Sequence, residues 1–373
     1  MTDAPLRPSV PLTFHHEPKV WIGCLECYNA GRLVGALFPL RRPGACAAGL
    51  RLPGNRRPAA GGDRTHRPGR RTVHPPRRGT QVRHARAADQ KLIKIGYPKA
   101  GPLIILSKLG RLEKALAPLG VNVEWREFTS GVQILEAMAS RSIDFAMTGD
   151  SPIIFAQANG TAVRYVAYEP SAPKSQGILV LKESPIARLE DLKGKRIAVQ
   201  RGSNCHFLTV AALKRAQLKL SDVKFEYMIA PDGRVALEGR NVDAYAVWDP
   251  LMTATIAGGA RQLIDGTDLS NNRFYYSATP ELGENRALLT ALVEEIGAAG
   301  QWINNNRREA ASILSPATGL STAIWVQALE HSTFGAKWIE QEPLVEQQRI
   351  ADSFVEIGLL PKPVRVSDIA LLS

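Results

Sequence analysis

The stretch "IDFAMTGDSPIIFAQANG" (residues 143–160) contains a strand, a polar turn and a helix in immediate succession. Its first five residues are mostly apolar, which is typical of a strand buried on both faces. Residues 152–159 carry apolar side chains at helical spacing, and Gly160 ends the helix. This strand–turn–helix unit predicts an α/β protein.

The same unit repeats on both sides of this stretch. Short apolar runs that predict strands alternate with patterns that predict amphipathic helices. Such a βαβαβαβ order is typical of a parallel sheet with helices on both faces. The expected strands are 92–98, 121–128, 143–147 and 163–169, and the expected helices are 103–116, 132–140 and 152–159.

A second, smaller α/β unit follows after Ser171 and Pro173 interrupt the pattern. Beyond it the chain is nearly all helical. Two α/β lobes with a helical tail predict a cleft between the lobes, where small ligands usually bind. The expected strands of this part are 177–182, 197–199, 223–230, 242–249 and 273–279, and the expected helices are 207–217, 232–238, 250–258, 284–305, 307–314, 320–332 and 343–357.

The formal net charge of +12 comes entirely from the first quarter of the chain. Residues 1–88 hold 16 basic and four acidic side chains, whereas residues 89–373 hold 31 of each. Domains that bind nucleic acid gather basic residues on their surface, so the neutral part does not have their composition. We expect no nucleic-acid partner.

Residues 1–88 have the composition of a disordered segment, rich in Arg, Pro and Gly. Such a segment buries too little apolar surface to offset the entropy of ordering. Two interpretations are open. One is a basic arm for nucleic acid or an anionic membrane; the other is non-native protein, such as translated sequence upstream of the true start.

Signals for export and for metal binding are weak in the same segment. The run "LVGALFPL" (33–40) is short, contains Gly and Pro, and does not make a valid signal peptide. Cys24 and Cys27 lie near His15 and His16, but no second cysteine pair follows at zinc-finger spacing. We expect no metal site and no cofactor.

Three strand-to-helix turns favour an anion site. Gly and small polar residues stand at the expected helix starts in "GYPKAGP" (96–102), "TGDSP" (148–152) and "RGSNCH" (201–206). The first turn of a helix has free N–H groups and the positive end of the helix dipole, so it binds anions. Capping is the alternative role for the polar side chains there, Asp150 and Ser203 among them. Neither nucleotide-binding glycine motif is present.

Seven motifs occur after residue 90 in a specific order: "IGYPKAG", "VEWREFTSGVQILEA", "IDFAMTGDSPIIFAQANG", "DLKGKRIAVQRGSNCH", "NVDAYAVWDP", "GGARQLIDGTDL" and "EQQRIADSFVEIGLLPK". Together they resemble the aliphatic-sulfonate-binding proteins of bacterial ABC importers, in a wider group that also binds taurine and nitrate. The resemblance implies a type II periplasmic binding protein fold. Its two α/β lobes would be joined by crossovers near 171–178 and 268–276, with lobe 1 formed by 89–175 and 274–373 and lobe 2 by 176–273.

The resemblance also implies a solute-binding role rather than an enzyme. Such a protein would act as a monomer in the periplasm, capture an organosulfonate anion in the cleft and deliver it to a permease in the inner membrane. The residues that match the family's ligand contacts come from the three turns above and from "WDP". They are Lys99, Ala100, Gly101, Thr148, Gly149, Asp150, Gly202, Ser203, Asn204, His206, Trp248 and Asp249.

The resemblance assigns these residues different roles. The turns would donate hydrogen bonds to the head group, and Trp248 would lie beside the organic tail. Asp150 would repel an anion, so we expect it to cap its helix or to orient His206. The chain departs from the usual family residues at three positions: Pro98 stands where relatives usually have Gln, and Thr129 and Val132 where they usually have Pro.

Three alternatives remain open. The same binding protein could take taurine, nitrate or sulfate. An enzyme of the same fold, desulfinase-like or pyrimidine-synthase-like, would need a reactive Cys or His in the cleft, and Cys205 is the one thiol after residue 88. A transcription regulator with this effector domain would need an N-terminal helix-turn-helix, which residues 1–88 do not resemble.

Overall fold

The computed structural model describes two short segments near the start and almost all of the chain from residue 91 on. The chain divides into two units, Met1–Gln81 and Val82–Ser373. The described residues are 19–23, 35–39, 91–360 and 362–372.

The described part of the first unit is one pair of strands. Strands β1 (Lys19–Gly23) and β2 (Gly35–Pro39) pair antiparallel, in a segment where the sequence pattern indicates no strand. The remainder of the predicted disordered segment, 1–88, lies outside the described residues. So do the cysteines and histidines considered for zinc.

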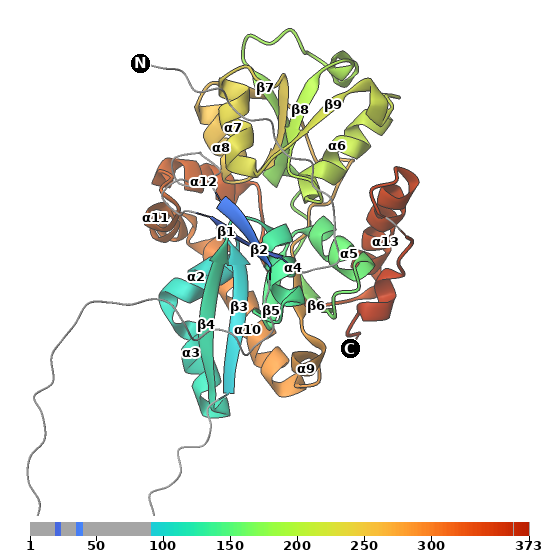
Figure 1. The fold of residues 1–373 in the computed structure, drawn as a ribbon. Helices are drawn as coiled ribbons and strands as arrows, with labels where there is room; N and C mark the ends of the chain where they lie inside the picture. Colours follow the sequence, from blue (N-terminus) through green and yellow to red (C-terminus); the bar gives the residue numbers. More distant parts are fainter. Residues whose placement is uncertain (1–18, 24–34, 40–90, 361, 373) are drawn as a thin grey trace, which may run out of the picture. The chain divides into compact units, whose positions relative to one another are not determined.

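Lobe 1 of the second unit is built on a six-stranded sheet. Its strand order is β13-β6-β12-β5-β3-β4, and Figure 1 shows β3, β4 and β5 side by side. All four strands predicted from the first repeats are present. The bounds are β3 (Lys91–Pro98), β4 (Val121–Phe128), β5 (Phe145–Thr148), β6 (Arg164–Tyr168), β12 (Tyr275–Ala278) and β13 (Lys337–Trp338).

The prediction of a wholly parallel sheet is wrong for lobe 1. Strands β3, β4 and β5 are parallel as expected. Strand β12, however, inserts between β5 and β6 and runs antiparallel to both. It reaches this place after the chain has passed through the second lobe, so its pairing partners are distant in sequence.

Helices cover both faces of this sheet. One face packs against α2 (Pro102–Leu109), α3 (Arg111–Leu116), α10 (Arg286–Asn305), α11 (Arg307–Thr318) and α12 (Thr322–Glu330). The other face packs against α4 (Gly131–Ala139), α5 (Asp150–Ala158) and α13 (Gln341–Glu356). Helix α9 (Pro280–Gly283) also belongs to lobe 1.

The single helix predicted over 103–116 is instead two helices. Gly110 ends α2 in the left-handed conformation (φ 61°) and donates its N–H to the carbonyl of Leu106. Glycine adopts this conformation at little cost, which makes it the usual residue at a helix C-terminus. The apolar spacing continues across the break, so the pattern alone does not reveal it.

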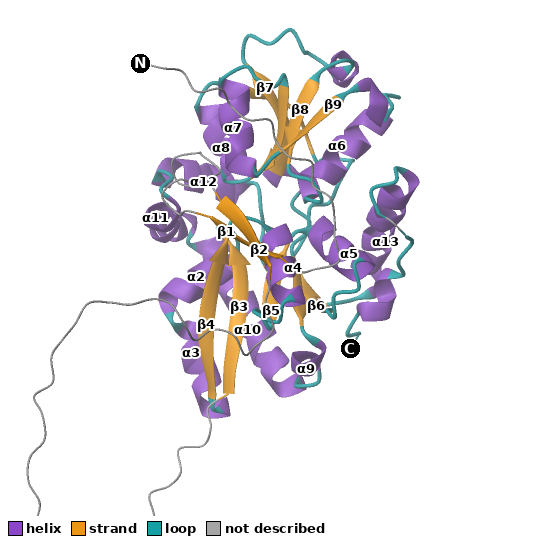
Figure 2. Ribbon diagram, viewed as in Figure 1, coloured by secondary structure: helices purple, strands orange, loops and turns teal. Residues whose placement is uncertain are grey.

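Lobe 2 is a five-stranded sheet between two helical layers. Figure 1 shows α6 on one side of β7, β8 and β9, with α7 and α8 on the other; Figure 2 shows the same layering by element type. The strand order is β11-β7-β10-β8-β9, and β11 was not predicted. The bounds are β7 (Gln176–Leu181), β8 (Arg196–Val199), β9 (Lys224–Tyr227), β10 (Ala244–Trp248), β11 (Ala260–Asp265), α6 (Asn204–Arg215), α7 (Ala230–Glu238) and α8 (Leu251–Ala257).

Two segments connect the lobes, one from β6 to β7 and one from β11 to β12. Both lobes therefore place strand ends and helix starts at the boundary between them. Within the described residues, no helix is long and apolar enough to cross a membrane.

Candidate ligand-binding site

A pocket lies at the boundary between the two lobes. Its empty space, mouth included, is about 750 Å³, and both lobes contribute to its wall. Small and polar residues form one part of the wall and aromatic residues another. The lining residues are Pro98, Ala100, Gly101, Ser130, Gly131, Val132, Gly149, Pro152, Ser175, Ser203, Asn204, Trp248, Asp249, Asn272, Phe274, Trp325, Ala328, Leu329, Ser332 and Phe334.

Four helices begin at the wall of this pocket. The N-cap residues of α2, α4, α5 and α6 are Gly101, Ser130, Gly149 and Ser203, and all four line it. The N-cap residues of α2, α4 and α5 make no side-chain cap hydrogen bond. Their first-turn N–H groups and the positive ends of their dipoles therefore face the same small space.

Helix α6 differs because its own residues satisfy its start. The Ser203 hydroxyl accepts the His206 backbone N–H (3.2 Å) and donates to the Gln200 carbonyl (2.7 Å). This side chain is an N-cap of the ordinary kind. The Ser203 hydroxyl thus both donates and accepts a hydrogen bond within lobe 2.

The backbone before α2 requires glycine. Gly101 has φ 76°, a conformation that other residues adopt only with strain. A Cβ atom there would also lie 2.6 Å from the Met147 Cε. The glycine in "PKAGP" thus lets the chain turn closely over β5 and start α2 at the pocket.

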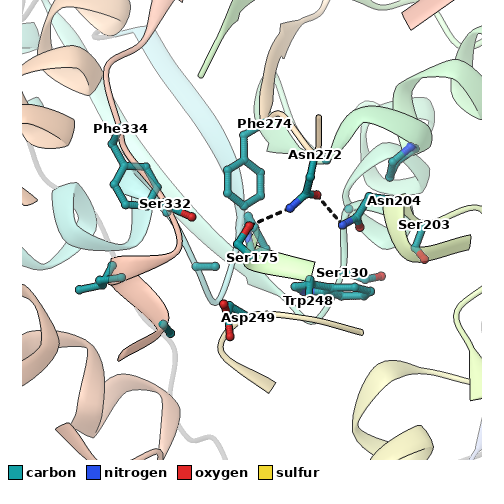
Figure 3. A pocket seen from close by; sticks show the side chains of 18 of the residues that line it. Ser130, Ser175, Ser203, Asn204, Trp248, Asp249, Asn272, Phe274, Ser332 and Phe334 are labelled. Atoms are coloured by element: carbon teal, nitrogen blue, oxygen red, sulfur yellow. Dashed lines mark hydrogen bonds between the residues drawn. The ribbon is translucent and has the colours of Figure 1, made fainter. Parts of the chain in front are cut away.

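Polar side chains join the lobes beside the pocket. Asn204 Nδ2 donates to Asn272 Oδ1 (2.7 Å) and to Gln176 Oε1 (3.0 Å), and Asn272 in turn donates to Ser175 Oγ (2.7 Å). Figure 3 shows the contacts of Asn272 with Asn204 and with Ser175 along the pocket wall. All four side chains are buried, so the crossover segments are tied to the start of α6.

Ser130 connects the lobes in a second way. Its hydroxyl oxygen accepts a hydrogen bond from Gln200 Nε2 (2.7 Å), which comes from the loop before α6. A hydroxyl that accepts one bond can still donate its own proton. Because Ser130 lines the pocket, that proton is available to an acceptor inside it.

The pocket contains little charge. Of the described residues that line it, only Asp249 has an ionisable side chain. Asp249 Oδ1 accepts from the backbone N–H (3.0 Å) and the hydroxyl (2.6 Å) of Thr253, and Oδ2 accepts from His331 Nδ1 (2.6 Å). The hydrogen bond to Asp249, more than any other contact, raises the pKa of His331.

The other part of the pocket is apolar. Figure 3 shows the rings of Phe274 and Phe334 toward one end, and Ser130, Ser203 and Asn204 toward the other. Trp325 and Leu329 add to the apolar wall. Trp248 also borders a neighbouring cavity that is lined in part by Pro231, Pro250, Leu251 and Leu320.

Seven of the twelve predicted residues line the pocket, and the other five do not. Lys99 borders the neighbouring cavity and forms an ion pair with Glu127 (3.3 Å). Thr148 is buried, and its hydroxyl donates to the Gly149 carbonyl (3.1 Å). The seven are Ala100, Gly101, Gly149, Ser203, Asn204, Trp248 and Asp249; the five are Lys99, Thr148, Asp150, Gly202 and His206.

His206 supports the loop from behind. Its Nδ1 accepts the Gly202 N–H (3.1 Å), and its ring packs edge-on against Phe225 and Tyr227. Burial lowers the pKa of His206 to about 4, so the ring is neutral at physiological pH. In this position it holds the "RGSNCH" turn in shape.

Asp150 also lies behind the pocket wall. Its Oδ1 accepts the Ser151 hydroxyl (2.8 Å) in the first turn of α5, and burial raises its pKa to about 6. Its described contacts do not include His206, so the expected orienting role is not seen. Cys205 is fully buried in α6, and burial raises the pKa of its thiol well above the ordinary value.

Sequence reasoning missed several residues of the wall. Ser130 could have been found, because it precedes the helix predicted from residue 132 as an N-cap type. Asn272, Phe274 and Phe334 carry no comparable local signal, since the crossover and the C-terminal helices bring them to the pocket. Ser175 and Ser332 belong with them.

Comparisons with known proteins show the family of this chain. The NMT1/THI5-like family model matches residues 117–310. An aliphatic sulfonates-binding protein of Escherichia coli (strain K12) is 37% identical over 285 residues, which cover 76% of this chain and 89% of that protein. The chain belongs to the aliphatic-sulfonate-binding protein family.

Solved structures of this family share the fold. The periplasmic aliphatic sulphonate binding protein SsuA of Escherichia coli matches with a TM-score of 0.70 and 35% identity, covering 75% of this chain and 91% of that one. The alkanesulfonate-binding protein SsuA of Xanthomonas axonopodis pv. citri, bound to MOPS, matches with a TM-score of 0.72 and 32% identity, covering 77% and 100%. The fold is that of a type II periplasmic binding protein, as predicted, and the chain is a solute-binding protein.

Proposed function

We propose that this member of the aliphatic-sulfonate-binding protein family captures an alkanesulfonate in the pocket between its lobes. The protein would act in the periplasm as a monomer and deliver the ligand to the permease of an ABC importer. Names of relatives support the ligand class and the compartment. A monomer suffices because one chain contributes residues from both lobes to the pocket.

One observation carries the ligand class. Three helix starts whose N-cap residues make no side-chain cap bond meet in a pocket with no cationic side chain among its described lining residues. Backbone N–H groups at helix starts suit an anion that is bound without a full counter-charge. A sulfonate is a monoanion at physiological pH, and its three oxygens can accept several bonds at once. Each charge-assisted bond contributes about 1.5–3 kcal/mol.

The apolar end of the pocket favours an organic tail on that anion. Phe274, Trp325 and Phe334 offer aromatic surface, and Phe274 and Phe334 lie away from Ser130 and Ser203 (Figure 3). Each buried methylene of a tail contributes about 0.8 kcal/mol. Nitrate and sulfate have no tail, so they would gain nothing from this surface.

Trp248 would decide how long a tail fits. It lies between the pocket and the neighbouring apolar cavity. A chain too long for the first space could continue past the indole into the second. Closure of the lobes about 171–178 and 268–276 would then enclose the ligand, and release to the permease would require reopening.

The enzyme alternative is less well supported. A desulfinase-like reaction would need a thiolate that faces the ligand, whereas Cys205 is fully buried and its pKa is raised. Thiolates of reactive cysteines are usually favoured by positive surroundings and partial exposure. The relatives of 30% identity or more are named as binding proteins.

Calorimetric titration of the full chain tests the proposed function. The panel contains methanesulfonate, butanesulfonate, octanesulfonate, taurine, nitrate and sulfate. We expect butanesulfonate and octanesulfonate to bind at least about tenfold more tightly than nitrate or sulfate, because the tail adds about 1.4 kcal/mol or more. Binding of nitrate or sulfate without binding of any sulfonate would refute the proposal.

A further inference from the structure

A charged contact crosses the boundary between the lobes at the rim of the pocket. His331 is the residue that ends α12 in lobe 1, and Asp249 follows β10 in lobe 2. Nδ1 of the imidazole lies 2.6 Å from Oδ2 of the carboxylate. The Asp249 side chain is 8% exposed and that of His331 is 32% exposed, so water screens this pair only in part.

Both partners are held rigidly. The two bonds from Thr253 fix the other oxygen of Asp249, and its backbone N–H donates to the Ser175 carbonyl (2.8 Å) in the crossover. His331 begins a loop, 331–335, that also carries Ser332 and Phe334 of the pocket wall.

Polar side chains of lobe 1 anchor this loop. The Asn304 side chain donates to the Phe334 carbonyl (2.7 Å) and accepts its N–H (3.0 Å). Arg307 donates to the Ser332 carbonyl (3.3 Å), and Glu169 accepts the Gly335 N–H (2.6 Å). Movement of lobe 2 against this loop must therefore break the contact between His331 and Asp249.

We infer that His331 is a positioning residue for ligand capture: by bonding Asp249 across the cleft it favours the closed pocket and makes ligand affinity depend on pH. This inference rests on the proposed binding of a sulfonate. His331 does not touch the pocket interior, so it acts through Asp249. Nothing in this role requires a direct contact between His331 and the ligand.

The sign of the pH dependence follows from the contact. The Asp249 carboxylate raises the pKa of His331 above the ordinary 6.5 while the lobes are together, and the opening of the cleft removes that effect. Closure is therefore favoured most below pH 6.5, where the imidazole is charged in both states. The added affinity is lost as the pH rises through the higher pKa of the closed state.

Other charged groups around His331 act in both directions. Besides Asp249, Glu330 on α12 raises its pKa, while Lys174 in the crossover and burial lower it. Arg307 faces the same loop through the Ser332 carbonyl. Glu169 titrates in the same range, because burial raises its pKa to about 7. Comparison with a variant that lacks only the imidazole separates His331 from these groups.

The test is the dissociation constant of butanesulfonate, measured by calorimetry from pH 5.5 to 8.5 on the full chain. We expect the wild type to bind butanesulfonate about 3- to 10-fold more weakly at pH 8.5 than at pH 5.5. This change lies between the contributions typical of exposed ion pairs and those of buried ion pairs. His331→Asn should change less than about twofold over the same range. Equal slopes in the two proteins would overturn the inference.

A matched control is the ion pair of Lys214 with Glu356, which also spans the lobes (3.1 Å) but is well exposed and away from the pocket. Lys214→Met should keep the pH dependence of the wild type. If no sulfonate binds to any of the three proteins, the proposed function fails.

A second readout tests the contact in the closed state. With the protein saturated with butanesulfonate, nuclear magnetic resonance titration of the His331 ring should give a higher pKa in the wild type than in Asp249→Asn. Equal values, or a raised value combined with affinity that does not vary with pH, would overturn the inference.

Discussion

The two lobes contribute to the pocket by different means. Lobe 1 supplies three helix starts whose N-cap residues, Gly101, Ser130 and Gly149, make no side-chain cap bond. Lobe 2 supplies one helix that Ser203 caps, together with the side chains of Trp248 and others. Lobe 1 therefore offers backbone donors together with the aromatic wall of Phe274, Trp325 and Phe334, whereas lobe 2 offers side chains.

This difference predicts which changes affect binding. Backbone donors are set by the fold and by glycine placement, so they recognise the anionic group whatever its tail. Side chains can vary without altering the fold, so the aromatic wall of lobe 1 and Trp248 of lobe 2 are suited to select the tail. Substitutions at the helix starts and at these side chains should separate head-group affinity from chain-length preference.

The largest effect is expected at Gly149. Its Cβ in Gly149→Ala would lie 3.5 Å from Asn204 Oδ1, an ordinary contact, so the fold should tolerate the change. The added methyl would crowd the start of α5 and weaken at least one charge-assisted bond, which lowers the affinity for every sulfonate by about 10- to 100-fold. Calorimetry with methanesulfonate and octanesulfonate measures this.

A matched control uses the same substitution elsewhere. Gly297→Ala in α10 places its Cβ 3.6 Å from the Ala336 carbonyl and away from the pocket. Its affinity should equal that of the wild type. If Gly149→Ala also binds normally, backbone donation from lobe 1 is not the source of head-group affinity.

Trp248→Ala should change chain-length preference. Loss of the indole removes apolar contact with the tail, so octanesulfonate should bind about 10- to 100-fold more weakly and methanesulfonate nearly as before. Trp338→Ala in β13, beneath Arg286, is the control outside the pocket. An equal loss for both ligands would place Trp248 at the head group.

Ser203 and Asn204 should respond differently although they are adjacent. Ser203→Ala removes a cap and should lower the free energy of unfolding by about 0.5–2 kcal/mol, with unchanged affinity. Asn204→Ala leaves the buried Asn272 and Gln176 oxygens without its two bonds and should cost about 1–3 kcal/mol. It should also weaken binding, since those bonds connect α6 to the crossovers. Urea unfolding and calorimetry measure both variants.

His206 should have the smallest effect on binding and a clear effect on stability. Its pKa is about 4 when folded and 6.5 when exposed, so the unfolded state takes up the proton first. Stability should fall by about 2–3 kcal/mol as the pH drops from 6.5 to 4. His206→Gln should reduce that slope without altering sulfonate affinity. A slope equal to that of the wild type in urea unfolding would contradict the assignment.

Much of the fold was predictable because its signals are local. The apolar run and the helical spacing in residues 143–160 predicted β5 and α5. The same kinds of pattern predicted most strands of both sheets. The position of β12 was not predictable, because its pairing with β5 and β6 depends on the path of the chain through lobe 2. Strand β11 lacks a clear alternation and was missed.

The part of the pocket wall that carries a local sequence signal was likewise predictable. The glycine-rich helix starts indicated Gly101, Gly149 and Ser203 as candidate site residues. Phe334 was not indicated, because it reaches the pocket through a loop far along the chain. The spacing of Asn204 and His206 carries further information. Side chains two residues apart on a helix point to nearly opposite sides, so only one of these two can face the ligand directly.

A crystal structure of the complex with hexanesulfonate tests the central claim most directly. The sulfonate oxygens should lie about 2.7–3.2 Å from backbone nitrogens in the first turns of α4 and α5 and in the turn before α2, with the alkyl chain toward Phe274 and Phe334. A sulfonate held by Lys99, or a ligand that leaves these helix starts unoccupied, would contradict it.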